Sequence, residues 1–313
     1  NMIRGSFKLE KSEKIWLDGS FVPWDEANVH VLTHTLHYGL GVFEGIRCYQ
    51  VKKNKSAVFR LQEHIDRLFD SAIVLGIDVP FSKKEIIAAV LQVVKKNKLE
   101  ECYIRPIVFL GHNQMGLNPS GVDVRVAIAA WPWGAYLGDE GINRGIRVRI
   151  SSFTRHHVNI NMTRAKACGY YINSILAKSE AVRDGYDEAI LLDPQGYVSE
   201  GSGENIFLLS KGRLKTPDLS CSNLEGITRD SVFEIAKHLK VDVEEGRITR
   251  DELYIADEVF LTGTAAEITP VREIDNRTIG NGKKGETTGR VQKMFFEIVH
   301  GNHTKFNKWL SNI

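Results

Sequence analysis

The sequence predicts an α+β (mixed α/β) fold with two unequal domains. Helical periodicities and strand-like runs alternate irregularly along the 313 residues, without an internal repeat. At about residues 131–141 the periodicity stops and glycine and aromatic residues accumulate, which suits a linker that also covers a ligand. We therefore expect a smaller N-terminal domain at 1–132, an interdomain loop at 133–144 and a larger C-terminal domain at 145–313.

The composition is that of an ordinary globular protein. Hydrophobic residues make up 42% of the chain and charged residues 26%, with a formal net charge of +2. This balance has no long basic or acidic block, so it argues against binding to nucleic acid or to an anionic membrane. The four cysteines are far apart and predict neither a zinc framework nor a disulfide scaffold, which suits a cytoplasmic protein.

The N-terminal half contains the clearer structural signals. The turn dipeptide Asp18-Gly19 between apolar runs predicts a β-hairpin at 14–24. Apolar periodicity predicts helices at 60–75 and 83–97, and two further runs predict strands at 101–110 and 123–131. Tyr103 and Arg105 should share one face of the first strand, because side chains alternate along a strand. The second strand is apolar almost throughout, so we expect it to be buried.

The stretch from residue 30 to residue 45 holds three histidines. His30, His34 and His37 would share one face of a helix, which allows a metal site. The glycines that follow argue against a long helix, and no acidic or cysteine ligand is near. We therefore expect no metal here and predict structural or polar-network roles for these histidines.

The glycines of the same stretch allow a second interpretation, a dinucleotide loop. Gly39, Gly41 and Gly45 form a pattern that is one residue too long for the fingerprint. No predicted strand leads into the stretch, and Glu44 would oppose a pyrophosphate. A loop that brings the backbone close to a bound ligand fits these glycines better.

The second half alternates short strands and helices. Strands are predicted at 145–152, 187–193, 204–209 and 257–262, and helices at 172–184, at 228–239 and after Gly289.

One lysine in this half stands out because of its neighbours. Lys166 lies among small residues and is followed closely by Tyr170 and Tyr171. A lysine can bind an aldehyde cofactor such as pyridoxal phosphate through a Schiff base. A solvated surface charge is the default for a lysine, so this interpretation depends on partners elsewhere in the chain.

Such partners occur further along the sequence. Glu200, flanked by glycines and serines, could pair with the ring nitrogen and keep it protonated. Gly226-Ile227-Thr228 opens a helix, so its N–H groups and the Thr228 hydroxyl suit a phosphate. Thr264 could complete that phosphate cradle.

Two residues outside this group could add contacts, and each candidate also has an ordinary alternative. Arg67 could supply a bidentate charge to the phosphate, or it could lie on a solvated helix face. Tyr171 could reach the ring hydroxyl. Glu200 and Glu204 could be surface charges of a loop, and Thr228 could be an N-cap.

As an ordered set, these stretches resemble the branched-chain amino acid aminotransferases of the bacterial type, which are class IV, fold-type IV pyridoxal phosphate enzymes. The resemblance covers nearly all of residues 14–300. The motifs that carry it are His37-Tyr-Gly-Leu-Gly-Val-Phe-Glu-Gly-Ile-Arg47, Tyr103-Ile-Arg-Pro106, Trp133-Gly-Ala-Tyr-Leu-Gly138, Ala165-Lys-Ala167, Ser199-Glu-Gly-Ser-Gly-Glu-Asn205, Gly226-Ile-Thr-Arg-Asp230 and Asp257-Glu-Val-Phe-Leu-Thr-Gly-Thr-Ala-Ala-Glu-Ile-Thr-Pro270.

The resemblance implies a site at the domain interface with Lys166 as the catalytic residue. The cofactor-binding residues that it implies are Arg67, Lys166, Tyr171, Glu200, Leu224, Ile227, Thr228 and Thr264. The substrate-binding residues that it implies are Tyr38, Phe43, Tyr103, Arg105, Leu117, Trp133, Tyr136, Thr264 and Ala265. Among these, Tyr103 and the backbone of 264–265 would take the α-carboxylate, and Arg105 the distal carboxylate of glutamate.

The implied activity is reversible transamination. The amino group of L-leucine, L-isoleucine or L-valine would pass to 2-oxoglutarate, which gives the branched 2-oxo acid and L-glutamate. A D-amino acid transaminase or an aminodeoxychorismate lyase on the same fold is the alternative, and a nucleotide-binding oxidoreductase is a more distant one. A homodimer or higher homo-oligomer is also implied, with loop 113–118 reaching the neighbouring site.

The sequence departs from the family pattern beside the catalytic lysine. Tyr170 stands where relatives usually have asparagine, and Cys168 where they often have glycine. The added bulk makes the shape of the substrate pocket harder to predict. Cys168 near a cationic site could have a lowered pKa, or it could be a small buried hydrophobic residue.

Overall fold

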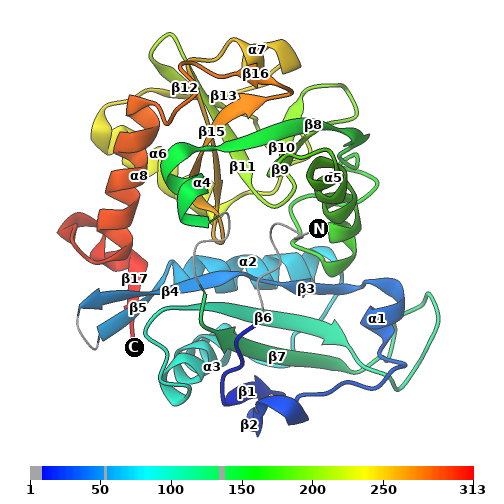
Figure 1. Cartoon of the computed structure of the whole chain (residues 1–313). Helices are drawn as coiled ribbons and strands as arrows, with labels where there is room; N and C mark the ends of the chain where they lie inside the picture. The colour runs from blue at the N-terminus through cyan, green and yellow to red at the C-terminus, as the bar shows by residue number, and fades with distance from the viewer. Residues whose placement is uncertain (1–8, 53–54, 134–137) are drawn as a thin grey trace. The chain divides into compact units, whose positions relative to one another are not determined.

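The protein forms two compact units, seen in a computed structural model that describes residues 9–52, 55–133 and 138–313 (Figure 1). One unit comprises the described part of Phe7–Gly134, with Ala165–Tyr171 and Ile298–Ile313. We call it the Lys166 unit. The other comprises the described part of Ala135–Arg164, with Ile172–Glu297, and we call it the Glu200 unit. Neither unit is one continuous segment, since the chain returns twice to the Lys166 unit.

The Lys166 unit is built on an antiparallel sheet. Among the described residues its strand order is β17-β5-β4-β6-β7-β1-β2, and β3 also pairs with β6. The strands are β1 (Lys14–Leu17), β2 (Ser20–Pro23), β3 (Gly41–Phe43), β4 (Ile46–Lys52), β5 (Lys55–Phe59), β6 (Cys102–Leu110), β7 (Val124–Trp131) and β17 (Leu310–Asn312).

Two long helices of this unit, α2 (Leu61–Val74) and α3 (Lys83–Lys96), share one hydrophobic core with the sheet. Their apolar positions recur at helical spacing, so each buries one face. A capping box at Ser82 and Glu85 begins α3. The shorter helices are η1 (Trp24–Glu26), α1 (His34–Tyr38), η2 (Cys168–Tyr170) and η3 (Thr304–Trp309).

Most elements predicted for this half are confirmed, and one property is not. The hairpin turns at Asp18 and Gly19, which both have positive φ, as a two-residue hairpin turn favours. Strand β7 is not buried throughout, because its burial alternates between buried and partly exposed positions. Its sequence VRVAIAAW has apolar residues on both faces, and β7 pairs antiparallel with β6 and β1. Apolar composition therefore did not indicate which face was covered.

The Glu200 unit contains a mixed sheet. Among the described residues its strand order is β10-β9-β8-β15-β14-β11-β12-β13, with β16 beside β15. Strand β8 runs parallel to both β9 and β15, and β12 runs parallel to β13. The strands are β8 (Ile146–Thr154), β9 (Glu188–Leu192), β10 (Val198–Gly201), β11 (Asn205–Ser210), β12 (Arg213–Thr216), β13 (Val243–Glu245), β14 (Glu258–Gly263), β15 (Glu267–Ile274) and β16 (Arg277–Thr278).

Helices of this part of the chain are α4 (Gly138–Arg144), α5 (Tyr171–Arg183), α6 (Ile227–Leu239), α7 (Arg250–Tyr254) and α8 (Glu286–Val299). The final helix predicted after Gly289 is confirmed, but α8 already begins at Glu286. Glu258 accepts hydrogen bonds from the N–H groups of Thr287 and Thr288 at 3.0 and 2.7 Å. These bonds satisfy donors that a helix start leaves open, so the helix can extend before the glycine.

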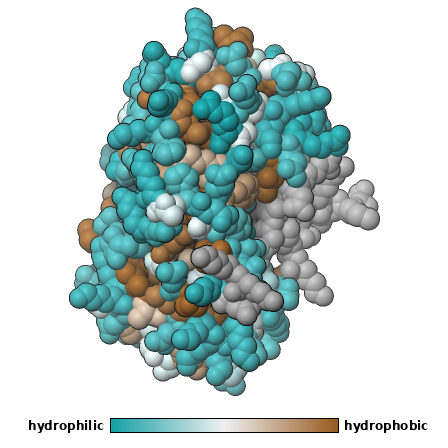
Figure 2. Space-filling model, turned by 90° about the vertical axis from the view of Figure 1, so that its left-hand side faces the viewer, coloured by the Kyte–Doolittle hydropathy of each residue, from teal (hydrophilic) through white to brown (hydrophobic). Residues whose placement is uncertain are grey.

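No described helix is long and apolar enough to cross a bilayer. Hydrophilic side chains cover most of the face in Figure 2, with separate hydrophobic patches among them.

Candidate active site

Lys166 is fixed through its backbone. In the Lys166 unit its N–H donates to Ser71 Oγ at 3.0 Å, and its carbonyl accepts from the Phe43 N–H at 3.1 Å. The next residue, Ala167, forms an isolated β-bridge with Val42. The lysine is thus held by β3 and α2, two elements that lie far from it in the sequence.

The Lys166 amine lies beside two aromatic rings. Nζ donates to Tyr171 Oη at 2.8 Å. It lies 5.2 Å from the centroid of the Phe43 ring and 5.4 Å from that of the Tyr171 ring. The surface-charge alternative is therefore wrong, since the side chain is partly buried and directed. A nucleophilic lysine needs this combination of partial desolvation and orientation.

A buried ion pair stands on the same unit. Glu44 is fully buried and accepts from Arg67 Nε at 2.7 Å, from Arg67 Nη2 at 2.9 Å and from His64 Nδ1 at 2.7 Å. Burial disfavours ionisation, but Arg67 and His64 outweigh it and hold the pKa of the Glu44 carboxyl well below its usual range. Burial lowers the pKa of His64, which favours a neutral ring that donates Nδ1–H.

This pair corrects two alternatives from the sequence. The Arg67 side chain is only 13% exposed, so it does not lie on a solvated helix face. Glu44 does not present a free negative charge, because Arg67 neutralises it. The contact through Nε and Nη2 orients the guanidinium, and an oriented guanidinium suits a phosphate.

Tyr103 and Arg105 lie side by side on β6, which confirms that they share one face. Arg105 Nη2 donates to Tyr103 Oη at 3.3 Å, and the guanidinium carbon lies 4.6 Å from the centroid of the Phe43 ring. Arg105 Nε is buried without a hydrogen-bond partner among the described residues. A buried cationic donor in this state suits an anionic ligand, since leaving it unpaired is costly.

Aromatic rings continue from this pair. The Tyr103 ring centroid lies 5.1 Å from that of Trp133 and 5.4 Å from that of Trp131. A Cβ on Gly45 would overlap Tyr103 Oη, so only glycine allows the backbone to lie this close to the Tyr103 side chain. Phe43 and Tyr103 are 8% and 7% exposed, so both rings are buried and present apolar surface.

Three other predicted substrate residues are not part of this group. Tyr38 is 44% exposed and lies beside the rings of His34 and His37, and Leu117 is 89% exposed. Tyr136 lies outside the described residues.

The two unusual residues beside Lys166 have different settings. Burial raises the pKa of the Cys168 thiol to about 11, although Arg105 opposes this rise. The alternative of a lowered pKa is therefore wrong, and Cys168 acts as a small apolar residue. Tyr170 is partly buried at the end of η2.

The histidines near the start of the chain take polar-network roles, as predicted. His34 Nε2 bonds to the Gly116 carbonyl at 2.8 Å, and His37 Nε2 bonds to the Val31 carbonyl at 2.8 Å. His30 stacks on His112 with ring centroids 4.8 Å apart. Each of the three histidine rings thus contacts a different partner.

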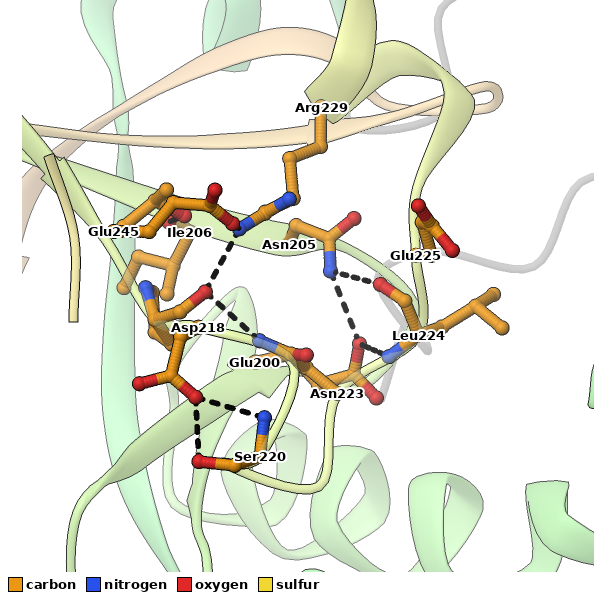
Figure 3. A network of polar contacts seen from close by, with 12 residues as sticks. Glu200, Asn205, Ile206, Asp218, Ser220, Asn223, Leu224, Glu225, Arg229 and Glu245 are labelled. Carbon is orange, nitrogen blue, oxygen red and sulfur yellow. Dashed lines mark hydrogen bonds and ion pairs between the residues drawn. The ribbon is translucent and has the colours of Figure 1, made fainter. Parts of the chain in front are cut away.

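The Glu200 unit carries the predicted acid on β10. Glu200 is 4% exposed, so the surface-charge alternative is wrong. Its Oε1 accepts from Arg155 Nη2 at 2.5 Å. Its Oε2 accepts from Asn205 Nδ2 at 3.3 Å and from the Leu224 N–H at 3.1 Å (Figure 3). The Arg155 guanidinium thus pairs with one oxygen of this carboxylate.

The start of α6 lies beside this carboxylate. Gly226 is the N-cap, so Thr228 is the second helical residue and the N-cap alternative is wrong. Ile227 and Thr228 are buried at 7% and 4% exposure. A Cβ on Gly226 would overlap Asn205 Oδ1, which explains the glycine. The first N–H groups of this helix lack intrahelical partners, and they suit a phosphate group.

A second turn of the Glu200 unit carries Thr264 and Ala265. Both are partly buried in the connection from β14 to β15. Gly263 packs on the preceding loop, where a Cβ would lie 3.4 Å from the Gly203 carbonyl oxygen. Thr262 Oγ1 is buried and has no hydrogen-bond partner among the residues described.

These groups fit pyridoxal phosphate on chemical grounds. The Lys166 unit supplies a directed amine and an oriented guanidinium, and the Glu200 unit supplies a buried carboxylate and an open helix start. Four further residues support these groups and were not assigned such roles from the sequence: Glu44, His64, Arg155 and Asn205. Two of them lie in motifs that the sequence singles out: Asn205 ends the motif that contains Glu200, and Glu44 lies in the stretch from His37 to Arg47.

Known proteins give a consistent result. The family model of amino-transferase class IV matches residues 41–274. A branched-chain-amino-acid aminotransferase of Pseudomonas aeruginosa is 55% identical over 295 residues, which cover 94% of this chain and 95% of that protein. That of Escherichia coli K12 is 47% identical over 305 residues, which cover 97% and 98%.

Solved structures agree in fold. The crystal structure of the Escherichia coli branched-chain amino acid aminotransferase has a TM-score of 0.94 and 48% identity, and it covers 96% of this chain and 99% of that one. The T.th. enzyme complexed with N-(5'-phosphopyridoxyl)-L-glutamate has a TM-score of 0.92 and 47% identity, covering 96% and 98%. The same enzyme has also been solved with 4-methylvaleric acid. The predicted fold is thus confirmed, and the chain belongs to the class IV amino-transferases, in the group of branched-chain-amino-acid aminotransferases.

Proposed function

We propose that this protein transfers the amino group of L-leucine, L-isoleucine or L-valine to 2-oxoglutarate, with pyridoxal phosphate as cofactor. The observation that carries this proposal is the Lys166 amine, which is held at 2.8 Å from Tyr171 Oη beside an apolar aromatic wall. Identities of 47–55% to branched-chain-amino-acid aminotransferases over nearly the full chain support the substrate class.

We assign the cofactor to residues of both units. Lys166 would bind its aldehyde carbon, Tyr171 its ring oxygen and Arg67 its phosphate. Glu200 would pair with the ring nitrogen, and Leu224 would lie against the ring. Ile227, Thr228 and Thr264 would complete the phosphate site. When bound, the cofactor supplies an electron sink that stabilises negative charge at the substrate Cα.

Lys166 would then act on the substrate proton. An amine displaced from the cofactor by the substrate amino group can accept the Cα proton and later return it, as general base and then general acid. Tyr171 Oη, which accepts from Nζ at 2.8 Å, would keep this amine near the reacting carbon. Aromatic rings around it exclude water, which strengthens the electrostatic interactions in the site.

Two kinds of substrate side chain must fit in one place. Phe43, Tyr103 and Trp133 offer apolar surface to a branched side chain, and the buried Arg105 Nε offers a donor to the distal carboxylate of glutamate. The complexes of the T.th. relative, one with a glutamate adduct and one with 4-methylvaleric acid, support such a dual pocket. Tyr103 and the backbone of 264–265 would take the α-carboxylate.

We also propose a homodimer or a higher homo-oligomer in the cytoplasm. Leu117 and Met115 are exposed by 89% and 44%, which suits the loop 113–118 as a contribution to a neighbouring site. Tyr38, also exposed, would line the apolar pocket for the substrate side chain. The four cysteines are free, which suits a reducing compartment.

The test is a half-reaction followed by absorption spectroscopy. Purified protein loaded with pyridoxal phosphate should lose its visible cofactor band on addition of L-leucine and regain it with 2-oxoglutarate. Lys166→Ala should abolish turnover, and retained turnover in that variant would overturn the mechanism. A response to D-alanine but not to L-leucine would favour a D-amino acid transaminase, and a response to aminodeoxychorismate alone would favour the lyase.

A further inference from the structure

The acceptor positions of Glu200 are almost all occupied by the protein itself. An ionised carboxylate offers about two acceptor positions on each oxygen. Oε2 accepts from Asn205 Nδ2 at 3.3 Å and from the Leu224 N–H at 3.1 Å, which fills it. Oε1 accepts from Arg155 Nη2 at 2.5 Å. Among the described residues, one acceptor position therefore remains, and it is on Oε1.

Asn205 is the group that joins this carboxylate to the loop before α6. One N–H of its Nδ2 faces Glu200 Oε2, and the other donates to the Leu224 carbonyl at 2.8 Å. Figure 3 shows the amide nitrogen between the Glu200 carboxylate and Leu224. Two acceptors beside the same atom fix the orientation of the amide, because a flipped oxygen would face both of them.

The amide itself has little freedom to move. Asn205 is 5% exposed and begins β11, where it pairs with Thr262 of β14. Its Oδ1 lies against the Gly226 backbone so closely that a Cβ there would overlap it. One side chain thus contacts the acid, the loop residue Leu224 and the N-cap of the helix assigned to the phosphate.

We propose that Asn205 is a positioning residue that acts through Glu200 on the ring nitrogen of the cofactor. By filling Oε2 it leaves Oε1, already polarised by Arg155, as the acceptor for the ring N–H. By donating to the Leu224 carbonyl, Asn205 also fixes the position of Glu200 Oε1 relative to Leu224 and the start of α6. This inference rests on the proposed function, because it takes Glu200 as the partner of the ring nitrogen.

The test compares the binding of two ligands, so it does not depend on turnover. The probes are pyridoxal 5'-phosphate and its 1-deaza analogue, in which C–H replaces the ring nitrogen. Wild-type protein should prefer pyridoxal 5'-phosphate. Asn205→Ala should bind it about tenfold more weakly, the effect expected when a bond to a charged group is lost, and should bind the analogue as wild type does.

Asn223→Ala is the matched control. Asn223 is also buried, at 1% exposure, and donates through Nδ2 to a backbone carbonyl, that of Pro217, at 3.2 Å. None of its hydrogen bonds reaches Glu200 among those the structure describes. The ratio of the two affinities should therefore stay at the wild-type value in Asn223→Ala and fall in Asn205→Ala.

The outcomes separate this inference from the proposed function. Suppose that Glu200→Gln lowers the preference for pyridoxal 5'-phosphate over the 1-deaza analogue. If Asn205→Ala then weakens the binding of both ligands equally, or changes neither, the positioning role of Asn205 is overturned. If wild type and Glu200→Gln do not discriminate between the ligands, the assignment of Glu200 fails and this inference fails with it. Asn205→Leu keeps much of the side-chain size and removes both donors without adding a charge, so it provides the same comparison if Asn205→Ala does not fold.

Discussion

Lys166 Nζ donates a hydrogen bond to Tyr171 Oη at 2.8 Å, and only five positions separate the two residues in the chain. The short helix η2 (Cys168–Tyr170) lies between them and turns the phenol back towards the amine. Gly169 packs closely on Gly39: its N–H donates to the Gly39 carbonyl at 3.0 Å, and a Cβ on Gly39 would lie only 2.9 Å from the Gly169 Cα. The pair is therefore set by local geometry, and its role can be tested by one substitution.

Tyr171→Phe should keep the ring and remove the hydroxyl. The Phe43 contact, with ring centroids 4.9 Å apart, should survive, so the protein should fold and bind cofactor. Loss of a hydrogen bond to the amine should lower kcat by roughly tenfold to a hundredfold, the range for a bond to a charged group. Steady-state kinetics with L-leucine check this, and an unchanged kcat would show that the phenol has no part in the reaction.

Glu44→Gln should destabilise the Lys166 unit. It keeps the shape but leaves the Arg67 guanidinium without its buried counter-charge, at a cost of about 3–5 kcal/mol. Chemical denaturation at pH 7 measures this loss. Glu63→Gln on α2, the helix that carries Arg67, is a control, since the Glu63 side chain is 39% exposed where it pairs with Arg60 and the change should cost less.

Wild type and Glu44→Gln should also differ in how their free energy of unfolding changes at acidic pH. The folded-state pKa of Glu44 lies below its ordinary value of 4.5, so its contribution to stability is complete above pH 4.5 and is lost as the pH falls further. Wild-type stability should therefore fall on acidification below pH 4.5, and Glu44→Gln should show a shallower fall. Equal acid slopes in the two proteins would contradict the ion pair as the source of this dependence.

Glu204 should produce a dependence of the opposite sign. Burial, with Glu188 nearby, raises the pKa of the Glu204 carboxyl to about 8 from an ordinary 4.5. Its contribution to stability is thus complete below pH 4.5 and is lost as the pH rises through 8. Glu204→Gln is neutral at every pH, so its stability relative to wild type should rise by about 1 kcal/mol for each pH unit between pH 4.5 and pH 8 and then level off. Melting curves across this range, with the exposed Glu234→Gln as control, check it.

Local sequence signals identified most helices and the hairpin, because periodicity and turn chemistry act over a few residues. They did not identify most of the short strands or those that depend on distant partners: β3, β4, β5, β10, β12, β13, β15, β16 and β17. Strand β17 forms only because it pairs with β5, and Arg60 N–H donates to the Trp309 carbonyl at 2.7 Å beside it. No pattern within residues 304–313 shows that contact.

The family resemblance, which is confirmed, pointed to the chemical groups but not to their supports. Lys166 and Glu200 stand in recognisable motifs, whereas Glu44 and Arg155 act through pairs that are remote in sequence. Arg155 Nη1 donates to Ser174 Oγ at 2.9 Å while Nη2 reaches Glu200, so one side chain joins α5 to β10. Such pairs follow from the fold, and the sequence offers no spacing that reveals them.

Arg105→Met should separate the two substrate classes. Methionine keeps length and apolar contact with Phe43 but removes the charge. The KM for 2-oxoglutarate should rise by roughly a hundredfold, as expected for loss of a charged hydrogen bond, while the KM for L-leucine should change little. Parallel kinetics on both substrates measure this split, and an equal rise in the two KM values would mean that Arg105 has a general packing role.

Two glycine substitutions should have opposite effects on stability. In Gly45→Ala the new Cβ would overlap Tyr103 Oη, and Tyr103 is 7% exposed and packed against Trp131 and Trp133. The Tyr103 side chain cannot move without disturbing these rings, so overpacking should lower the free energy of unfolding by about 1–3 kcal/mol, and substrate binding should weaken. A Cβ at Gly289 in α8 would meet no atom within 4 Å. Gly289→Ala should therefore stabilise the protein by about 0.5–1 kcal/mol, because alanine favours a helix. Denaturation of both variants under one condition measures the difference, and a stable, active Gly45→Ala protein would show that Tyr103 is free to move.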